Sequence, residues 1–404
     1  MPLRSIFVDL NSYFASVEQA ERPELMGRPV AVVPMMAETT CCLAASYPAK
    51  AFGIRTGTLV KDARKLCPKI TFVEADHHKY VDYHHRIIKA VERCLPVWKV
   101  LSIDEMAIQL FGKEQHIDYA RAKAIEIKQR ILKDVHPALT CSIGIAPNRY
   151  LAKIASDMQK PDGLTVIRSE ELPERLFDLE LRDFPGIGPR MEARLLEARC
   201  SSVRKLCQQS VSEMCQLWGS KVGHDFWRLI RGEELPERST ERGSISHSRV
   251  LSPDSRTPEK AWSHLVSLVS KAAMRLRQEE FYARCLHLNI KYLVPGIGRE
   301  SWEEKSRFLE TQDTAIFLQE LSELWSQAPK QHIFKIGIVI SSLVSAKKHQ
   351  LCLWDNPKQG RLMSALDAIN KAHRKNLVVF GASSALEKIP HAPIAFGHIP
   401  EEYE

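Results

Sequence analysis

The first 166 residues place their hydrophobic positions at two different spacings, and the spacing changes from one stretch of chain to the next. Short apolar or alternating runs are typical of strands, whereas apolar residues three and four apart are typical of helices. Strands are predicted at Ser5–Leu10, Pro29–Pro34, Thr40–Ser46, Val100–Ile103, Met106–Leu110 and Thr140–Ile145. Helices are predicted at Tyr13–Ala20, Thr58–Cys67, His77–Leu95, Tyr119–Val135 and Asn148–Gln159. This succession predicts an α+β sandwich with an antiparallel or mixed sheet.

The pattern changes twice in the remaining chain. From about residue 171 to residue 232, short helical stretches are separated by turns that contain glycine, and Pro236–Ser246 is polar and aperiodic, which predicts a linker. A second α+β block is predicted over Ile245–Ser345. Its predicted helices are Pro258–Glu279 and Thr314–Ser326, its predicted strands are Ala283–Tyr292 and Phe334–Leu343, and a further helix is expected near Arg361–His373.

Composition narrows the class of protein. The 404 residues give room for about three domains, and 57 Lys+Arg against 49 Asp+Glu leave a net charge of +8. This charge fits a polyanionic partner, since each neutralised phosphate releases counterions. No apolar run approaches the roughly 20 residues that span a bilayer, and Met1–Leu10 lacks the features of a secretion signal. No membrane contact and a cytoplasmic location are therefore expected. The ten cysteines include no C-x-x-C pair, which predicts reduced thiols.

Carboxylates stand where predicted strands end. Asp9 is at the end of the first strand, and Asp104 and Glu105 occupy the turn of a predicted hairpin. Strand ends that meet at one edge of a sheet would bring these acids together, and three close anions repel one another unless a cation lies among them. Oxygen ligands favour Mg²⁺ or Mn²⁺, and a pair of such ions suits phosphoryl transfer. The alternative is that Asp9 caps the helix beginning near Ser12, while Asp104 and Glu105 only solvate a turn.

Two histidine pairs, His77-His78 and His84-His85, lie on a predicted polar helix without cysteine neighbours. A protein zinc site needs further ligands. A solvated surface is therefore expected for these histidines.

The sequence around the carboxylates resembles the Y family of DNA polymerases, the DinB and UmuC group. The stretches FVDLNSYFASVE (residues 7–18) and SIDE (residues 102–105) resemble the two carboxylate motifs of that family. Two further stretches match at the expected places, ASYPAKAFGI (residues 45–54) and CSIGIAPN (residues 141–148), the latter continuing through LAKIASD to Lys160-Pro161. The resemblance covers roughly residues 4–345.

The resemblance implies a role for each matching residue. Asp9, Asp104 and Glu105 would be the metal ligands, with the backbone carbonyl of Leu10 completing one site. The nucleotide would be contacted by Tyr13, Phe14, Tyr47, Lys50 and Lys160. Among these, Phe14 would be the steric gate that clashes with a ribose 2′-hydroxyl, and Tyr47, Lys50 and Lys160 would donate to the triphosphate, where negative charge builds.

Other stretches resemble the parts of the family that hold DNA or partners. The turn containing Gly186 and Gly188 resembles a helix-hairpin-helix, which binds phosphate through backbone amides. Arg249 and Lys335 match cations expected on template phosphates, although Phe334 stands where some relatives carry a second arginine. The peptide formed by Gln350, Leu351, Cys352, Leu353 and Trp354 resembles the one that bacterial polymerases insert into the sliding clamp.

The fold implied by the resemblance is a multi-domain α+β right hand. It has a ferredoxin-like palm (residues 1–10 and 76–167), small inserted fingers (11–75), a helical thumb (168–235), a linker (236–244), an α+β little finger (245–345) and a C-terminal tail (346–404). The implied activity is template-directed addition of dNTPs to a primer 3′-end by a monomer with two Mg²⁺ ions, or Mn²⁺ in their place. The implied biological role is low-fidelity translesion synthesis in DNA damage tolerance.

Two alternatives remain open. One is a catalytically silent relative that binds DNA and recruits partners, and the intact carboxylates Asp9, Asp104 and Glu105 speak against it. The other is a cyclase-type enzyme with a related palm. The glycine turn and the second block, where residues 241–350 carry 16 Lys+Arg against 12 Asp+Glu, disfavour it, because a small-molecule cyclase has no use for a DNA groove.

Overall fold

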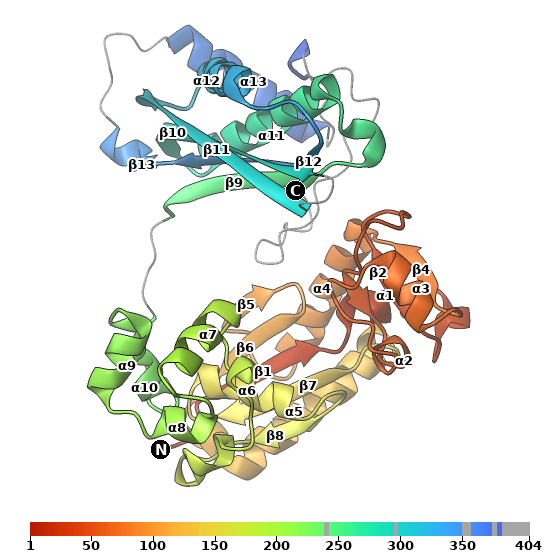
Figure 1. Cartoon of the computed structure of the whole chain (residues 1–404). Helices are drawn as coiled ribbons and strands as arrows, with labels where there is room; N and C mark the ends of the chain where they lie inside the picture. Colours follow the sequence, from red (N-terminus) through yellow and green to blue (C-terminus); the bar gives the residue numbers. More distant parts are fainter. Residues whose placement is uncertain (238–241, 295–297, 350–356, 374–377, 382–404) are drawn as a thin grey trace. The chain divides into compact units, whose positions relative to one another are not determined.

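The structure is a computed structural model that describes all residues except 238–241, 295–297, 350–356, 374–377 and 382–404 (Figure 1). The described chain divides after Glu237 into two compact units. This division falls within the stretch predicted as a linker. Each unit has its own sheet and its own hydrophobic core.

A five-stranded sheet forms the centre of the first unit, in the order β5-β6-β1-β7-β8. Its strands are β1 (Ser5–Leu10), β5 (Lys99–Ser102), β6 (Glu105–Gln109), β7 (Cys141–Ala146) and β8 (Leu164–Val166). The central strand β1 is antiparallel to β6 and β7, while β7 is parallel to β8. All six residues of β1 are buried, as expected for a strand covered on both faces. The prediction of an α+β fold with a mixed sheet is confirmed.

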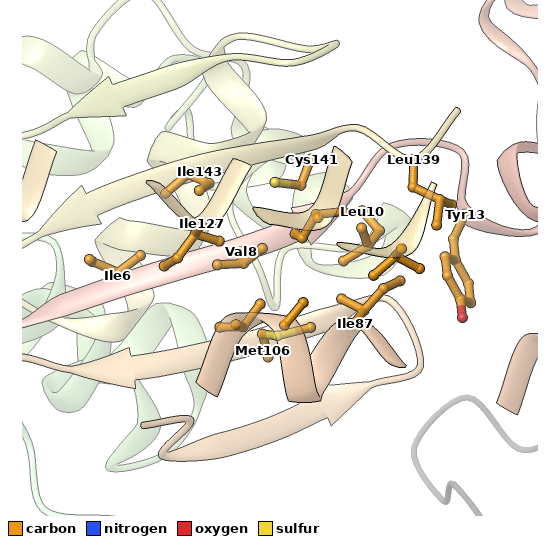
Figure 2. Packing of buried hydrophobic residues seen from close by; sticks show 14 of the residues in the cluster. Ile6, Val8, Leu10, Tyr13, Ile87, Met106, Ile127, Leu139, Cys141 and Ile143 are labelled. Atoms are coloured by element: carbon orange, nitrogen blue, oxygen red, sulfur yellow. The ribbon is translucent and has the colours of Figure 1, made fainter. Parts of the chain in front are cut away.

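The helices that cover this sheet are α4 (His77–Glu92), α5 (Ile117–Arg130, continued by a π-helical turn) and α6 (Arg149–Met158). Ile6, Val8 and Leu10 share one core with α4 and α5 (Figure 2). Phe7 belongs to another core, which it shares with α6. Because side chains alternate along a strand, Asp9 faces the same side of the sheet as Phe7. Its carboxylate is therefore directed toward α6.

Helix α6 approaches β7 closely at Gly144. A Cβ atom at this position would lie 2.0 Å from the carbonyl oxygen of Ala152 and 2.4 Å from the amide nitrogen of Ser156. Backbone atoms of a packed helix cannot yield by that much, so glycine alone fits. This close approach holds α6 against the strands that carry the acids.

Residues 11–75 contain a second, three-stranded sheet in the order β3-β2-β4. Its strands are β2 (Val30–Val33), β3 (Ala44–Ala45) and β4 (Thr71–Glu74), and its neighbours are the helices α1 (Tyr13–Glu21), α2 (Tyr47–Lys50) and α3 (Val60–Leu66). The strand predicted at Thr40–Ser46 is shorter than expected. Strand β4 was not predicted, because a single four-residue run is too short to show a period.

A group of short helices completes the first unit. They are α7 (Pro189–Glu197), α8 (Val203–Cys207), α9 (Val211–Trp218) and α10 (Val222–Leu229). Their buried residues join the core that α6 contributes to. The helical character predicted for residues 171–232 is thus present, with glycine turns such as Gly219 ending α9.

The second unit is built on a sheet in the order β11-β10-β12-β9. Its strands are β9 (Ser244–Val250), β10 (Phe281–Val294), β11 (Gly298–Thr311) and β12 (Ile333–Ser341), and a short β13 (Val344–Ser345) pairs with β10. Helices α11 (Pro258–Gln278) and α12 (Thr314–Gln327) share a core with one face of the sheet, and α13 (Pro357–Ala372) follows later in the chain. Strand β11 was not predicted, because this edge strand is largely exposed and so rich in charge that it shows no apolar face.

The structure also bears on the predictions about membrane helices, cysteines and the histidine pairs. No helix among the described residues has the length and apolar character needed to cross a membrane. The cysteines in the described part of the chain are free thiols. The prediction of a solvated surface is wrong for His84, which is 3% exposed with Nδ1 2.8 Å from the carbonyl oxygen of Ile103. Tyr80, His84 and Ile87 share one stripe of α4, so the stripe that faces the core includes this histidine.

Candidate active site

The three predicted metal-binding acids come together at one end of the first sheet. Asp9, near the end of β1, lies directly opposite Glu105 in the antiparallel pairing of β1 with β6. Asp104 immediately precedes Glu105 in the turn between β5 and β6, and its backbone oxygen accepts a 2.9 Å hydrogen bond from the Leu10 amide. The alternative role of Asp9 as a helix cap does not occur, since Ser12 is the N-cap of α1 and no side chain caps it.

The electrostatic environment of these acids favours a bound cation. Burial raises the pKa of Asp104, and the charge of Asp9 raises it further, whereas a hydrogen bond from the Ser102 hydroxyl opposes the shift. Burial likewise raises the pKa of Glu105, against the opposing effect of Lys153. Buried carboxylates whose pKa values rise in this way gain most from a positive charge placed among them.

Two lysines supply positive charge in the structure. Lys153 of α6 places Nζ 2.6 Å from Oδ2 of Asp9 and 2.7 Å from Oε1 of Glu105. Lys160 places Nζ 2.8 Å from Oδ1 of Asp9, and both lysines also pair with Asp157. Burial alone would lower the pKa of Lys153, but the carboxylates of Asp9, Asp157 and Glu105 outweigh it and raise the pKa.

Sequence reasoning assigned no role to Lys153 or Asp157. Both lie in the LAKIASD stretch, which was quoted only as part of the family resemblance. Their spacing of four residues on a predicted helix was the available signal, because it places both side chains on one face.

The donor set fits a divalent cation in its chemistry. Carboxylate and carbonyl oxygens are the ligands that Mg²⁺ and Mn²⁺ prefer. Within the described residues, no three acidic, histidine or cysteine side chains already surround a single point. The ammonium group of Lys153 lies between Asp9 and Glu105 instead, so these oxygens are already arranged to share one cation.

A cleft of about 300 Å³ opens beside the acids. Its lining contains most of the residues predicted to bind metal or nucleotide, namely Asp9, Leu10, Tyr13, Phe14, Lys50, Asp104, Glu105 and Lys160, together with Lys153, which was not predicted. Residues more than 140 positions apart in the sequence therefore share one cavity, with acids at one side and cations beside them.

Tyr47 lies close to this group without lining the cleft. Its hydroxyl is 3.4 Å from Oδ1 of Asn11, and Nζ of Lys50 lies 4.3 Å from the centre of its ring. Burial raises the pKa of Tyr47 and lowers the pKa of Lys50, which Lys160 lowers further. Lys50 and Lys160 are thus close enough to repel each other, and an anion between them would relieve that repulsion.

Comparison with known proteins identifies the family. The impB/mucB/samB family profile matches residues 8–157, and the profile of its C-terminal domain matches residues 242–353. DNA polymerase IV of Moorella thermoacetica is 32% identical over 384 residues, which cover 92% of this chain and 94% of that protein. DNA polymerase IV of Pelotomaculum thermopropionicum is 29% identical, with 96% and 95% covered.

The chain belongs to the Y family of DNA polymerases. It is a DNA-directed DNA polymerase, as predicted. The fold agrees with solved Y-family structures. A chimera of the Y-family polymerases Dbh and Dpo4 superimposes with a TM-score of 0.70 at 23% identity, covering 85% of this chain and 99% of that one. The insertion ternary complex of Dbh DNA polymerase gives a TM-score of 0.56 with the same coverage.

The glycine turn of this Y-family polymerase precedes α7. Gly186 has a φ of 94°, a left-handed conformation that favours glycine. Gly188 is the N-cap of α7 and Pro189 is its first residue. The carbonyl of Pro185 accepts a 2.9 Å hydrogen bond from the Tyr150 hydroxyl, which joins the turn to α6.

The two cations predicted to contact template DNA lie on opposite faces of the second unit's sheet. Arg249 pairs in register with the buried Ile336, so its side chain faces α11. Lys335 pairs with Val250, which is 52% exposed, so its side chain lies on the open face. Burial lowers the pKa of Arg249. The predicted clamp-binding residues Gln350, Leu351, Leu353 and Trp354 lie outside the described residues.

Proposed function

We propose that this polymerase adds dNTPs to a primer 3′-end on a DNA template by two-metal-ion nucleotidyl transfer at the cleft beside Asp9, Asp104 and Glu105. The observation that carries the proposal is the cross-strand pairing of Asp9 with Glu105, with Asp104 adjacent, because it gathers three acids from distant parts of the chain. Asp9, Asp104, Glu105 and the Leu10 carbonyl would hold two Mg²⁺ ions, or Mn²⁺ in their place. When bound, such ions activate a 3′-hydroxyl and neutralise charge on a triphosphate.

The polymerase's own cations would receive the triphosphate. Lys50 and Lys160 line the cleft beside the acids, and Tyr47 lies next to Lys50. Their donors would bind the phosphate oxygens and stabilise the charge that builds on the leaving pyrophosphate. Lys160 is paired with Asp9 in the structure, so nucleotide binding would exchange a carboxylate partner for a phosphate.

Tyr13 and Phe14 would form the floor beneath the sugar. Both line the cleft from the start of α1, and Phe14 is 5% exposed. The Tyr13 hydroxyl donates a 2.6 Å hydrogen bond to the carbonyl of Tyr80, which fixes the first turn of the helix. A fixed aromatic ring at this place would exclude a 2′-hydroxyl and so select dNTPs over ribonucleotides.

The arrangement supports a right-hand architecture with an open site. The five-stranded sheet would be the palm, residues 11–75 the fingers, the short helices the thumb and the second unit the little finger. The proposed fingers contain a three-stranded sheet whose strands have two to four residues. So small a segment would cover little of a nascent base pair, which would give low fidelity and tolerance of damaged templates in translesion synthesis.

DNA would be held through its phosphates by residues of both units. The amides around Gly186 and Gly188 would contact a phosphate without reading sequence. On the second unit, Lys335 and Lys291 face each other across β12 and β10 on the open face, where they suit template phosphates. Arg249 remains a predicted phosphate contact, although it faces α11. The peptide at residues 350–354 would bind a sliding clamp, and the polymerase itself would act as a monomer.

Primer extension with Mg²⁺ tests the proposal. Asp9→Asn, Asp104→Asn and Glu105→Gln should each lower kcat/KM at least about a thousandfold, because each removes a ligand of the charge-neutralising centre. Asp118→Asn, an exposed acid in the first turn of α5, is the matched control and should act like the parent. Retained synthesis after any of the three ligand changes would refute the assignment.

A second assay separates lesion bypass from ordinary copying. On a panel of damaged templates, the parent should extend primers past at least one lesion. Stalling at every lesion, combined with normal extension on undamaged DNA, would contradict the translesion role. DNA binding without synthesis on any template would instead favour the silent scaffold.

A further inference from the structure

A short loop after α6 carries Lys160 to the acids. The loop, Lys160–Gly163, connects α6 with β8, and Nζ of Lys160 lies 2.8 Å from Oδ1 of Asp9. Asp162 has a φ of 56°, a conformation that few side chains adopt without support. The conformation of this loop therefore sets where the Lys160 ammonium lies.

Lys128 of α5 holds this loop from behind. Its Nζ lies 3.0 Å from the carbonyl oxygen of Cys141, 2.5 Å from that of Asp162 and 3.1 Å from that of Gly163. The same atom lies 2.8 Å from Oδ1 of Asp162, and the Lys128 side chain is 15% exposed. Most lysines on a helix surface extend into water, whereas all the donor capacity of this one is used on a single loop and the strand beside it.

These contacts imply that the conformation of the loop depends on the ammonium group of Lys128. Three carbonyl oxygens and a carboxylate converge on one point, and without a cation they would repel one another. The Gly163 carbonyl would keep the Ile143 amide as a donor, but every oxygen of the group would lose the ammonium. Gly163 is also confined, because its amide donates to Oγ of Ser142 and a Cβ at this residue would lie 1.9 Å from the Gln159 carbonyl oxygen. The loop thus has little room at Gly163, and Lys128 satisfies the carbonyl groups of Asp162 and Gly163 there.

We propose that Lys128 is a positioning residue for dNTP binding, which acts by fixing the Lys160–Gly163 loop so that Lys160 meets the triphosphate. The inference rests on the proposed role of Lys160. Lys128 itself points to the loop's carbonyls and does not line the cleft, so its effect on the nucleotide passes through Lys160.

Single-nucleotide incorporation on a primer-template tests the inference. Lys128→Ala should raise the KM for dNTP about tenfold, because a small misplacement of a binding group is costly, while the Kd for primer-template stays at the parent value. Lys128→Arg, which keeps the charge, should restore part of the affinity. The matched control is Lys123→Ala on the same helix. Lys123 pairs with its helical neighbour Glu126 at 2.9 Å and lies over the ring of Tyr119, another residue of α5, so its replacement should leave the KM unchanged.

A double substitution shows whether Lys128 acts through Lys160. If it does, adding Lys128→Ala to Lys160→Ala should change the KM by less than about twofold, because residues that act as a unit are not additive. A further tenfold rise in the Lys160→Ala background would overturn the inference, as would an unchanged KM in Lys128→Ala. A merely structural role would lower the unfolding temperature without this non-additivity.

Failures of the two proposals give different results. If Lys160→Ala raises the KM and Lys128→Ala does not, the inference about Lys128 alone is wrong. If Lys160→Ala leaves the KM unchanged, the proposed triphosphate contact fails and the inference about Lys128 fails with it. Should Lys128→Ala not fold, Asp162→Asn removes only the carboxylate partner at a position where asparagine tolerates the backbone. That variant should give a smaller rise in KM, and no rise would count against the inference.

Discussion

The ring of Phe14 stacks on the ring of Tyr80, with centroids 4.3 Å apart and planes inclined by 20°. Tyr80 is fully buried, and its hydroxyl donates a 2.8 Å hydrogen bond to Oε1 of the buried Glu18. The proposed gate therefore has a rigid support behind it. A ring held in this way cannot move aside for a larger sugar, because packed interiors yield little to added atoms.

Replacing the gate should change sugar selectivity more than activity. Phe14→Ala is expected to raise ribonucleotide incorporation relative to dNTP incorporation on the order of 100-fold, which corresponds to relief of about 2.7 kcal/mol of steric conflict. Tyr80→Leu, which removes the supporting ring together with its hydrogen bond to Glu18, should give a smaller change in the same direction. The ratio of kcat/KM for a matched rNTP and dNTP pair measures both. An unchanged ratio in Phe14→Ala would show that another residue selects the sugar.

Clamp-dependent synthesis should depend on residues 350–354. Replacing Leu353 and Trp354 by alanine should weaken clamp binding at least about 30-fold, as expected for apolar residues that anchor an interface, and leave synthesis without the clamp unchanged. Flanking residues are anchored on the second unit. The His349 ring stacks on Tyr282 with centroids 3.6 Å apart, and Arg277 binds Asp367 of α13 through two hydrogen bonds. An equal loss of synthesis with and without the clamp would contradict the assignment.

Much of the site could be predicted from the sequence because its residues occupy short contiguous motifs. Asp9 and Phe14 share one motif, and Asp104 and Glu105 share another, so resemblance finds them together. The role of Lys153, by contrast, could not be predicted from its motif. Its contact with Asp9 joins residues 144 positions apart, and only the close approach of α6 to β7 at Gly144 brings it there.

Two features of the second unit also could not be predicted from the sequence. Strand β11 has no hydrophobic face to signal it, since an exposed edge strand is specified by its pairing with β10. At Phe334, where some relatives carry a second arginine, the sequence itself offers no positive charge. In the structure, Arg299 and Arg256 place their guanidinium carbons 4.6 Å and 5.4 Å from the centre of the Phe334 ring. Two arginines that are distant in sequence thus lie beside a position that carries no charge of its own.

Gly144 should be intolerant of any side chain. Gly144→Ala is expected to destabilise the first unit by about 3 kcal/mol or more, because the added methyl group would overlap the α6 backbone. Denaturant unfolding measures the loss. Gly188→Ala is the control within the same unit, since its φ is ordinary and a Cβ there has no neighbour within 4 Å, and it should change stability by less than about 1 kcal/mol. Similar stabilities for the two variants would disprove the close-packing argument.

Acid should destabilise the second unit through a buried histidine. His264 of α11 is 5% exposed, and burial, reinforced by Arg249, lowers its pKa to about 4 from 6.5. Above pH 6.5 the histidine is neutral in both the folded and the unfolded chain. Below it the unfolded chain binds the proton first, so stability falls as the pH drops from 6.5 toward 4, by on the order of 3 kcal/mol in total.

His264→Leu tests this origin of the acid sensitivity. The variant should lose less stability than the parent between pH 6.5 and pH 4 in denaturant titrations. The exposed His373→Gln should follow the parent. Parallel curves for His264→Leu and the parent would assign the sensitivity to other groups.

The open face of the second unit's sheet should account for a measurable part of the DNA affinity. Lys335→Ala and Arg299→Ala should each weaken binding to primer-template, since we expect each side chain to contact one phosphate. Each substitution should then make the dependence of log K on log salt shallower by about one unit. Lys330→Ala is the control, because Lys330 lies 5.9 Å from the ring centre of Trp325 on α12. Arg249→Ala separates two interpretations of a residue that faces α11. A shallower salt dependence would make Arg249 a phosphate contact, whereas lower stability with an unchanged salt dependence would confine its role to the packing of α11.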